Sequence, residues 1–125
     1  AAELGSSTVA AVLLRGFRID YRSYFEENDV AAVVFPTTRL PARPISGDAT
    51  VEFMGEQVLT TLSYVHNLAP ATITGAPGLS IPVGLTPSGT PVALELDGPI
   101  GEDRAVLAIG LSFEEIFPPP KPPLD

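Results

Sequence analysis

The chain has 125 residues, of which 45% are hydrophobic and 18% are charged, and this composition is typical of one globular domain rather than a disordered chain. Its formal net charge of −8 argues against nucleic acid or an anionic membrane as a partner, because there is no basic stripe to bind phosphates. The absence of cysteine excludes disulfides and a cysteine nucleophile, and it favours a cytoplasmic location.

The first predicted elements are a helix and a buried strand. Residues 6–26 form the predicted helix, because Leu13, Phe17 and Tyr21 recur with the spacing of one helical face. Residues 30–35 are apolar at every position. That pattern predicts a strand that is buried on both faces of a sheet.

Shorter elements are expected in the middle of the chain. Proline and glycine interrupt this part of the sequence, and they separate short runs with strand or helix character. The expected elements are an irregular loop over 36–49, a small hairpin of strands 50–53 and 56–59 around Met54-Gly55, and helical turns over 61–67 and 70–74.

The strongest local signal is a hairpin in the second half of the chain. Two alternating apolar runs, 79–85 and 92–96, flank a turn at 86–90 that contains Pro87 and Gly89. Proline cannot donate a hydrogen bond to a ladder, so the proline at position 82 places the first strand at an edge or beside a bulge. A helix over 102–117 and an extended proline-rich tail over 118–125 complete the prediction.

These elements make an α/β fold, with a mixed β-sheet flanked by helices, but they are too few to complete it. A strand that is apolar on both faces needs a layer on each side, and only two long helices and a hairpin are available. The chain also begins with Ala1, and its only methionine is Met54. We therefore expect residues 1–117 to be an incomplete domain, taken from a longer polypeptide.

Few residues in the chain have the spacing of a catalytic centre. Ser80 lacks the second glycine of a nucleophile elbow, and His66, followed by Asn67, is the only histidine. No metal site is expected, because cysteine is absent and the carboxylates are scattered. Glu95 and Asp97 are interpreted as solvated charges on the polar face of a strand. No self-contained active site is predicted from these residues.

Three stretches together resemble the C-terminal part of the amidase signature family. They are residues 24–37 (YFEENDVAAVVFPT), residues 72–84 (TITGAPGLSIPVG) and residues 89–99 (GTPVALELDGP), and the resemblance extends from about residue 10 to residue 117. Within that family, the LELDGP segment and the upstream His66-Asn67 pair are most similar to mandelamide and indoleacetamide hydrolases.

The resemblance implies hydrolysis of a carboxamide, of arylacetamide or mandelamide type, to an acid and ammonia, without a metal or cofactor. It also implies a catalytic Lys–Ser–Ser triad, which the family carries in its N-terminal part. The only lysine here is Lys121, in the proline-rich tail. This chain is therefore expected to need the remainder of an amidase as its partner, and not to hydrolyse amides alone.

The resemblance places three residues of this chain in a substrate-binding wall. These are Thr72, Ile73 and Thr74, which match the family segment that approaches the substrate, although the family usually has asparagine at the position of Thr72. The same residues could instead pack the interior of the domain.

Two alternatives remain open from the sequence. The chain could be a free-standing, non-catalytic module that uses its apolar helix and hairpin surfaces to associate with itself or with a partner. It could also be an independent small hydrolase that uses Ser80 and His66.

Overall fold

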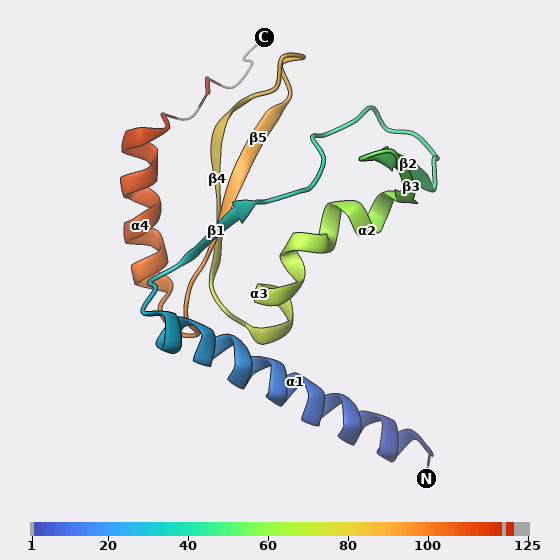
Figure 1. Cartoon of the computed structure of the whole chain (residues 1–125), viewed down its shortest axis with the longest axis vertical. Coiled ribbons are helices and arrows are strands. Elements are labelled where there is room, and N and C mark those ends of the chain that lie inside the picture. The colour runs from blue at the N-terminus through green and yellow to red at the C-terminus, as the bar shows by residue number, and fades with distance from the viewer. Residues whose placement is uncertain (1, 119, 122–125) are drawn as a thin grey trace.

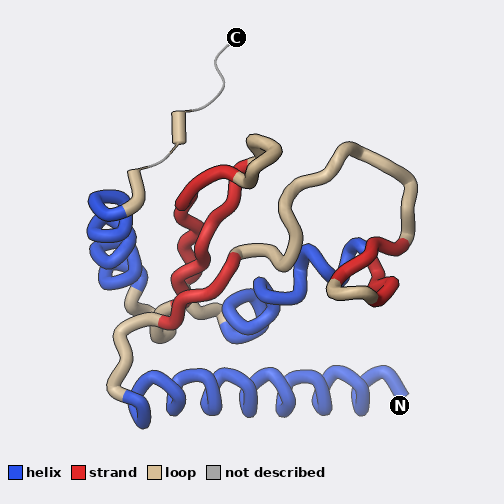
Figure 2. Tube along the Cα trace, turned by 45° about the horizontal axis from the view of Figure 1, so that its top comes forward, coloured by secondary structure: helices blue, strands red, loops and turns tan. Residues whose placement is uncertain are grey.

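The computed structural model describes residues 2–118, 120 and 121, with side chains from Ala10 onward. It confirms the α/β class predicted from the sequence (Figures 1 and 2). The elements in chain order are α1 (Ala2–Asn28), β1 (Val33–Pro36), β2 (Thr50–Phe53), β3 (Glu56–Leu59), α2 (Thr60–Val65), a 3₁₀ turn (His66–Leu68), α3 (Ala69–Thr74), β4 (Gly78–Leu85), β5 (Pro91–Asp97) and α4 (Asp103–Ile116).

The predicted hairpin is the central structure of the chain. Strands β4 and β5 pair antiparallel, and their turn is closed by the Thr86 N–H, which donates to the Thr90 carbonyl at 2.8 Å. The register shifts between Pro82 and Gly84, and β4 is an edge strand. Both the bulge and the edge position therefore accommodate the proline, as the sequence predicts.

Strand β5 lies in the middle of a three-stranded sheet of order β1–β5–β4, in which both pairs are antiparallel. Side chains alternate along a strand, so Leu94 and Leu96 lie on one face of β5 while Glu95 and Asp97 lie on the other. Figure 2 shows this sheet between α4 on one side and α3 on the other. The two faces of β5 therefore meet different helices.

Helix α4 covers the leucine face. The core here has buried residues at its centre and partly buried ones around it: Ile81, Leu96 and Val106, with Leu79, Ile109 and Phe113 packed against them. Close approach of the helix depends on Gly110, because a Cβ at that position would clash with the Leu79 side chain. The apolar residues of α4 therefore pack against the sheet.

Strand β1 differs from its prediction in length and burial. It begins at Val33 rather than Val30, and it pairs only with β5 among the strands described. The expected burial of both faces is wrong, because Val34 is 47% exposed. Val34 lies on the leucine side of the sheet, where α4 packs mainly against β4 and leaves β1 uncovered.

Helix α1 is longer than predicted, and much of its apolar face is exposed. Phe25, near its C-terminal end, is buried at 3% exposure, whereas Leu13 and Phe17 are 58% and 56% exposed. Figure 1 shows why: the N-terminal half of the helix extends away from the rest of the chain. The apolar periodicity of this helix is therefore satisfied only at one end.

The middle of the chain follows the sequence prediction closely. Strands β2 and β3 form the expected small hairpin, and Met54 and Gly55 both adopt positive φ angles, of 54° and 86°. The irregular loop over 36–49 is held by two side chains from the helical segment beyond it. Tyr64 donates to the Pro41 carbonyl at 2.8 Å, and Asn67 donates to the Pro36 carbonyl at 2.7 Å.

The predicted tail falls mostly outside the described residues. Pro118, Pro120 and Lys121 are described and are not in a helix or strand, whereas Pro119 and residues 122–125 lie outside the description. Among the residues that were searched, none of the helices combines the length and the apolar character that a membrane span requires.

Two helical glycines should respond to the same substitution in opposite ways. Gly110→Ala should destabilise the chain by about 1–3 kcal/mol, because the new methyl group overpacks the interface between α4 and β4. Gly16→Ala should stabilise it by up to about 1 kcal/mol, since a Cβ at Gly16 meets no atom within 4 Å and alanine favours the helix. Urea unfolding monitored by circular dichroism measures both. Equal effects at the two sites would contradict the packing of α4 described above.

Candidate functional site

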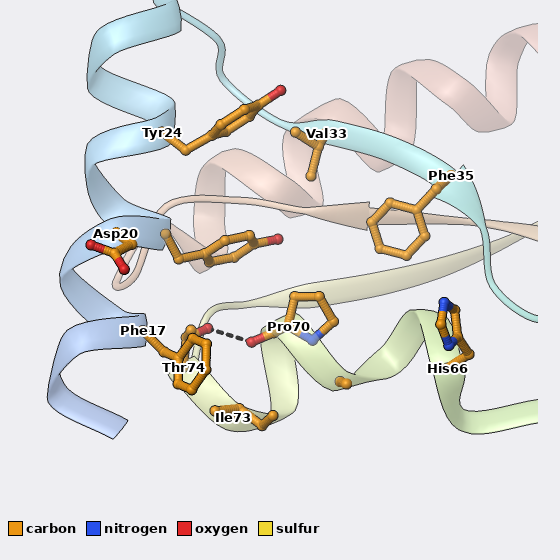
Figure 3. A pocket seen from close by; sticks show the side chains of 11 residues that line it. Phe17, Asp20, Tyr24, Val33, Phe35, His66, Pro70, Ile73 and Thr74 are labelled. Carbon is orange, nitrogen blue, oxygen red and sulfur yellow. Dashed lines mark hydrogen bonds between the residues drawn. The ribbon is translucent and has the colours of Figure 1, made fainter. Parts of the chain in front are cut away.

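An open cavity of about 570 Å³ lies between α1, β1 and α3. Figure 3 shows that Tyr24 from α1 and Val33 and Phe35 from β1 form one side of it, opposite Pro70 and Ile73 from α3. Aromatic and aliphatic side chains therefore make up most of the lining.

The charge of this lining is concentrated at one place. Asp20 is the only acidic residue among those that line the cavity. Its carboxylate points away from Phe35 and from His66, which lies at the opposite end (Figure 3). The interior of the cavity thus favours an uncharged, ring-shaped group over an anion.

Local sequence rules explain why these side chains converge. Phe17, Tyr21 and Tyr24 are spaced three and four residues apart, so they share one face of α1. Val33 and Phe35 are two apart on β1 and therefore share one face of the sheet. The cavity forms where these two faces meet.

Helix α3 is bounded by two residues that fix its short length. Pro70 lies at the start of the helix, where its missing N–H costs no hydrogen bond. Gly75 ends the helix in the left-handed region with a φ of 73°, as the sequence predicts, and its N–H donates to the Ala71 carbonyl at 2.8 Å. This pair of boundaries presents Ile73 and Thr74 to the cavity.

A polar contact joins the cavity wall to the covered face of the sheet. The hydroxyl of Tyr21, which lines the cavity, donates to Asp97 Oδ2 at 2.8 Å. The pKa of Tyr21 is raised above its ordinary value, first by burial and then by this hydrogen bond. The phenol therefore stays protonated as a donor at neutral pH.

The interpretation of Glu95 and Asp97 as solvated charges is wrong. Glu95 is 8% exposed and Asp97 is fully buried. The alternation along the strand is as predicted, but the polar face of β5 is closed to water, and Tyr21 of α1 packs over it and bonds to Asp97. Burial raises the pKa of both carboxyl groups, while the hydrogen bond from Tyr21 opposes that rise at Asp97.

Two of the three predicted wall residues line the cavity. Ile73 and Thr74 do so, and Thr72, which is exposed, does not. The hydroxyl of Thr74 is directed into its own helix, where it donates to the Pro70 carbonyl at 2.7 Å (Figure 3). Ile73 thus offers an apolar surface, and Thr74 has its single donor engaged in holding α3 together.

Ser80 and His66 are not brought together. The Ser80 hydroxyl is 2.7 Å from the Thr37 hydroxyl, whereas His66 lines the cavity, which Ser80 does not. No hydrogen bond joins these two residues, both of which the structure describes. Asn67 is engaged with the Pro36 carbonyl. The arrangement lacks the nucleophile–base contact that an independent serine hydrolase requires.

The sequence predicts the elements that line this site, but it does not predict that they lie together. Helical spacing predicts that Phe17 and Tyr21 share one face, but it does not predict which element that face meets. The contact between Tyr21 and Asp97 joins residues 76 positions apart in the chain, and no local pattern predicts such a pairing. For Phe35, the sequence predicts a place in a strand and no role in a site.

Comparison with known proteins gives a consistent result. The profile of the amidase family matches residues 8–107. An indoleacetamide hydrolase of Rhizobium radiobacter is 47% identical over 95 residues, which cover 76% of this chain and 20% of that protein. A fatty acid amide hydrolase of Arabidopsis thaliana is 32% identical over 120 residues, which cover 94% of this chain and 19% of that protein. The chain thus spans about a fifth of the length of these relatives.

Solved structures agree in fold. A crystal structure of an amidase aligns with a TM-score of 0.65 and 32% identity, over 70% of this chain and 20% of that one. The structure of 6-aminohexanoate cyclic dimer hydrolase aligns with a TM-score of 0.69 over 84% of this chain and 23% of that one. At 20% identity, this second likeness concerns the fold alone.

The two threonines of α3 provide a matched test of the site description. Thr74→Val should destabilise the chain by about 1–2 kcal/mol, because it removes a buried hydroxyl that bonds to the Pro70 carbonyl. Thr72→Val should stay within about 0.5 kcal/mol of the unmodified chain, because Thr72 is exposed. Denaturant unfolding of both variants measures the difference, and an equal loss at the two sites would show that the Thr74 hydrogen bond contributes nothing.

Proposed function

Because this chain belongs to the amidase signature family, we propose that it forms one wall of the substrate pocket in an enzyme that hydrolyses a carboxamide to a carboxylic acid and ammonia. The observation that carries the proposal is the cavity between α1, β1 and α3, with its aromatic and aliphatic lining. Its volume of about 570 Å³ lies within the range of roughly 300–1,000 Å³ that is usual for small-molecule sites.

The proposed substrate is an arylacetamide. The rings of Phe17, Tyr24 and Phe35 offer faces and edges against which a flat aromatic group can pack. A relative with 47% identity is named an indoleacetamide hydrolase, and the indole of such a substrate is a neutral aryl group of suitable kind. A mandelamide-type amide carries a phenyl group and would use the same wall.

We assign the bond-breaking chemistry to the rest of the polypeptide. Family membership implies a Lys–Ser–Ser triad, and the single lysine of this sequence, Lys121, lies next to Pro120 and Pro122. Ser80 is paired with Thr37 and not with a base. The role proposed for this chain is therefore to bind and orient the aryl end of the substrate, while the remainder attacks the carbonyl.

The remainder of the enzyme is also proposed to cover the exposed apolar surfaces. Val12 and Leu13 on α1, and Leu107 and Leu111 on α4, are all more than half exposed. Large exposed apolar surfaces are usually buried against another part of the molecule. The relatives are nearly four times as long as this chain, and the additional polypeptide can bury this surface.

The test uses the full polypeptide that carries this sequence, assayed with indole-3-acetamide and with acetamide. Phe35→Ala should lower kcat/KM for indole-3-acetamide by about 10-fold or more, because the aryl contact is lost, and should change the value for acetamide little. Leu85→Ala is the matched control, since Leu85 is exposed on β4 and does not line the cavity.

Two results would contradict the proposal in different ways. An equal fall for both substrates would mean that Phe35 supports the fold and does not select the aryl group. No hydrolysis of either amide by the unmodified polypeptide would reject the amidase function itself, and would favour the non-catalytic module.

A further inference from the structure

The covered face of the sheet holds two carboxyl groups that point toward the same spot. Glu95 and Asp97 are two positions apart on β5, so their side chains leave the same face of the sheet. A Cβ built on Gly78, which is opposite Asp97 on β4, would lie 3.0 Å from both Glu95 Oε1 and Asp97 Oδ1. The missing side chain of Gly78 therefore leaves the space in which the two carboxyl groups converge.

The hydrogen bonds available to this pair do not satisfy it. Tyr21 donates to Asp97 Oδ2 at 2.8 Å. The Thr37 hydroxyl is 2.7 Å from the Ser80 hydroxyl, and it can donate to Glu95, whose pKa it lowers, only when Ser80 is the donor in that contact. Glu95 Oε2 and Asp97 Oδ1 remain buried with no partner.

The described groups that contact the pair are hydroxyls. They come from Tyr21 on α1 and from Thr37 after β1, and Thr37 in turn contacts Ser80 on β4. Burial raises the pKa of both carboxyl groups and the charge of Asp97 adds to the rise at Glu95, whereas the Thr37 hydroxyl opposes the rise at Glu95 and the Tyr21 hydroxyl opposes it at Asp97. Arg18 on α1 reaches the end of α3 instead, where its Nη2 would lie 3.3 Å from a Cβ on Gly75. Two buried carboxylates without a cation are unfavourable, because each loses its hydration and each repels the other.

We propose that Glu95 and Asp97 form a proton-binding pair that holds one shared proton at pH values where exposed carboxyl groups are already ionised. The proton bonds covalently to one carboxyl oxygen and is donated to an oxygen of the other carboxylate, so the pair carries one negative charge instead of two. A shared proton supplies a donor where the buried oxygens have none. This inference is independent of the proposed amidase activity.

Other occupants fit the geometry less well. Asp97 has no exposed surface and Glu95 has 8%, so a basic group from outside cannot reach the unpartnered oxygens without opening the sheet. A metal ion would need further ligands, and among the residues that were searched no group of three or more His, Asp or Glu side chains could supply them. A proton is small enough to occupy a site that is already closed.

The proposal fixes the sign of a pH effect on stability. In the unfolded chain both carboxyl groups lose their protons near pH 4. The folded chain keeps one proton to higher pH, so between these points it binds more protons than the unfolded chain, and its stability falls as the pH rises. The stabilising effect of the bound proton is complete below the unfolded pKa, and it is lost once the pH passes the raised pKa of the pair.

Amide variants separate a shared proton from two independent groups. Glu95→Gln and Asp97→Asn each replace one member with a neutral group that can donate to the carboxylate left behind. Either single substitution should therefore remove the whole fall of stability with rising pH, and should raise the urea midpoint above that of the unmodified chain at the alkaline end. Glu114→Gln is the matched control on the exposed side of α4, and it should keep the full pH dependence.

A direct titration keeps the proposal testable even if a variant does not fold. Carbon-13 NMR of the unmodified chain should show the carboxyl carbons of Glu95 and Asp97 moving together in one step, at higher pH than the carboxyl carbons of exposed side chains, as coupled groups do. Two results would overturn the shared proton: both carbons titrating at the same pH as the exposed carboxyl groups, or pH slopes in which each variant removes only its own separate part.

Discussion

The central strand β5 presents leucines on one face and carboxyl groups on the other, and both faces are buried. Helix α4 satisfies the leucine face through a close approach at Gly110. The carboxyl face cannot be covered by apolar side chains alone, because a buried carboxyl group needs hydrogen-bond donors. Tyr21 supplies one of them from α1, and this contact ties the C-terminal end of a long helix to the middle of the sheet.

The cavity follows from that attachment. Once Tyr21 is bonded to Asp97, the aromatic face of α1 is directed along β1 and toward α3. Phe35 and Val33 share the sheet face that carries the carboxyl pair, so the apolar cavity and the buried charges are neighbours on one surface. A change in the charge of the pair would therefore act directly on Tyr21, which bonds to Asp97 and lines the proposed aryl site.

Much of the local structure could be predicted, because it depends on residues close together in the chain. Pro82 indicated an edge or a bulge, and the structure has both. Met54-Gly55 indicated a tight turn, and both residues adopt positive φ. These features need no knowledge of distant segments, since proline and glycine restrict or release the backbone wherever they occur.

The failures concern what covers each surface. Val34 was expected to be buried because its run is apolar throughout, yet it is 47% exposed, and no helix in the described part of the chain covers its side of β1. Asp97 was expected to be solvated because charge usually faces water, yet a tyrosine 76 positions away covers it. Of the cavity lining, Ile73 and Thr74 were named from family resemblance, and their contact with substrate stays a prediction, whereas the aromatic wall required the relative placement of α1 and β1. Sequence patterns identify which side chains share a face of a helix or strand, but they do not identify the element that packs against that face.

The central claim is that this chain is an open part of a larger amidase domain, in which β5 is buried on both faces and much of α1 is exposed. Amide hydrogen exchange, measured on this chain and on the full polypeptide that carries it, tests this most directly. We expect residues 94–97 of β5 to be protected in both, and residues 10–20 of α1 to exchange rapidly in this chain and slowly in the full polypeptide. Equal exchange of residues 10–20 in the two would contradict the claim, because α1 would then gain no cover from the rest of the enzyme.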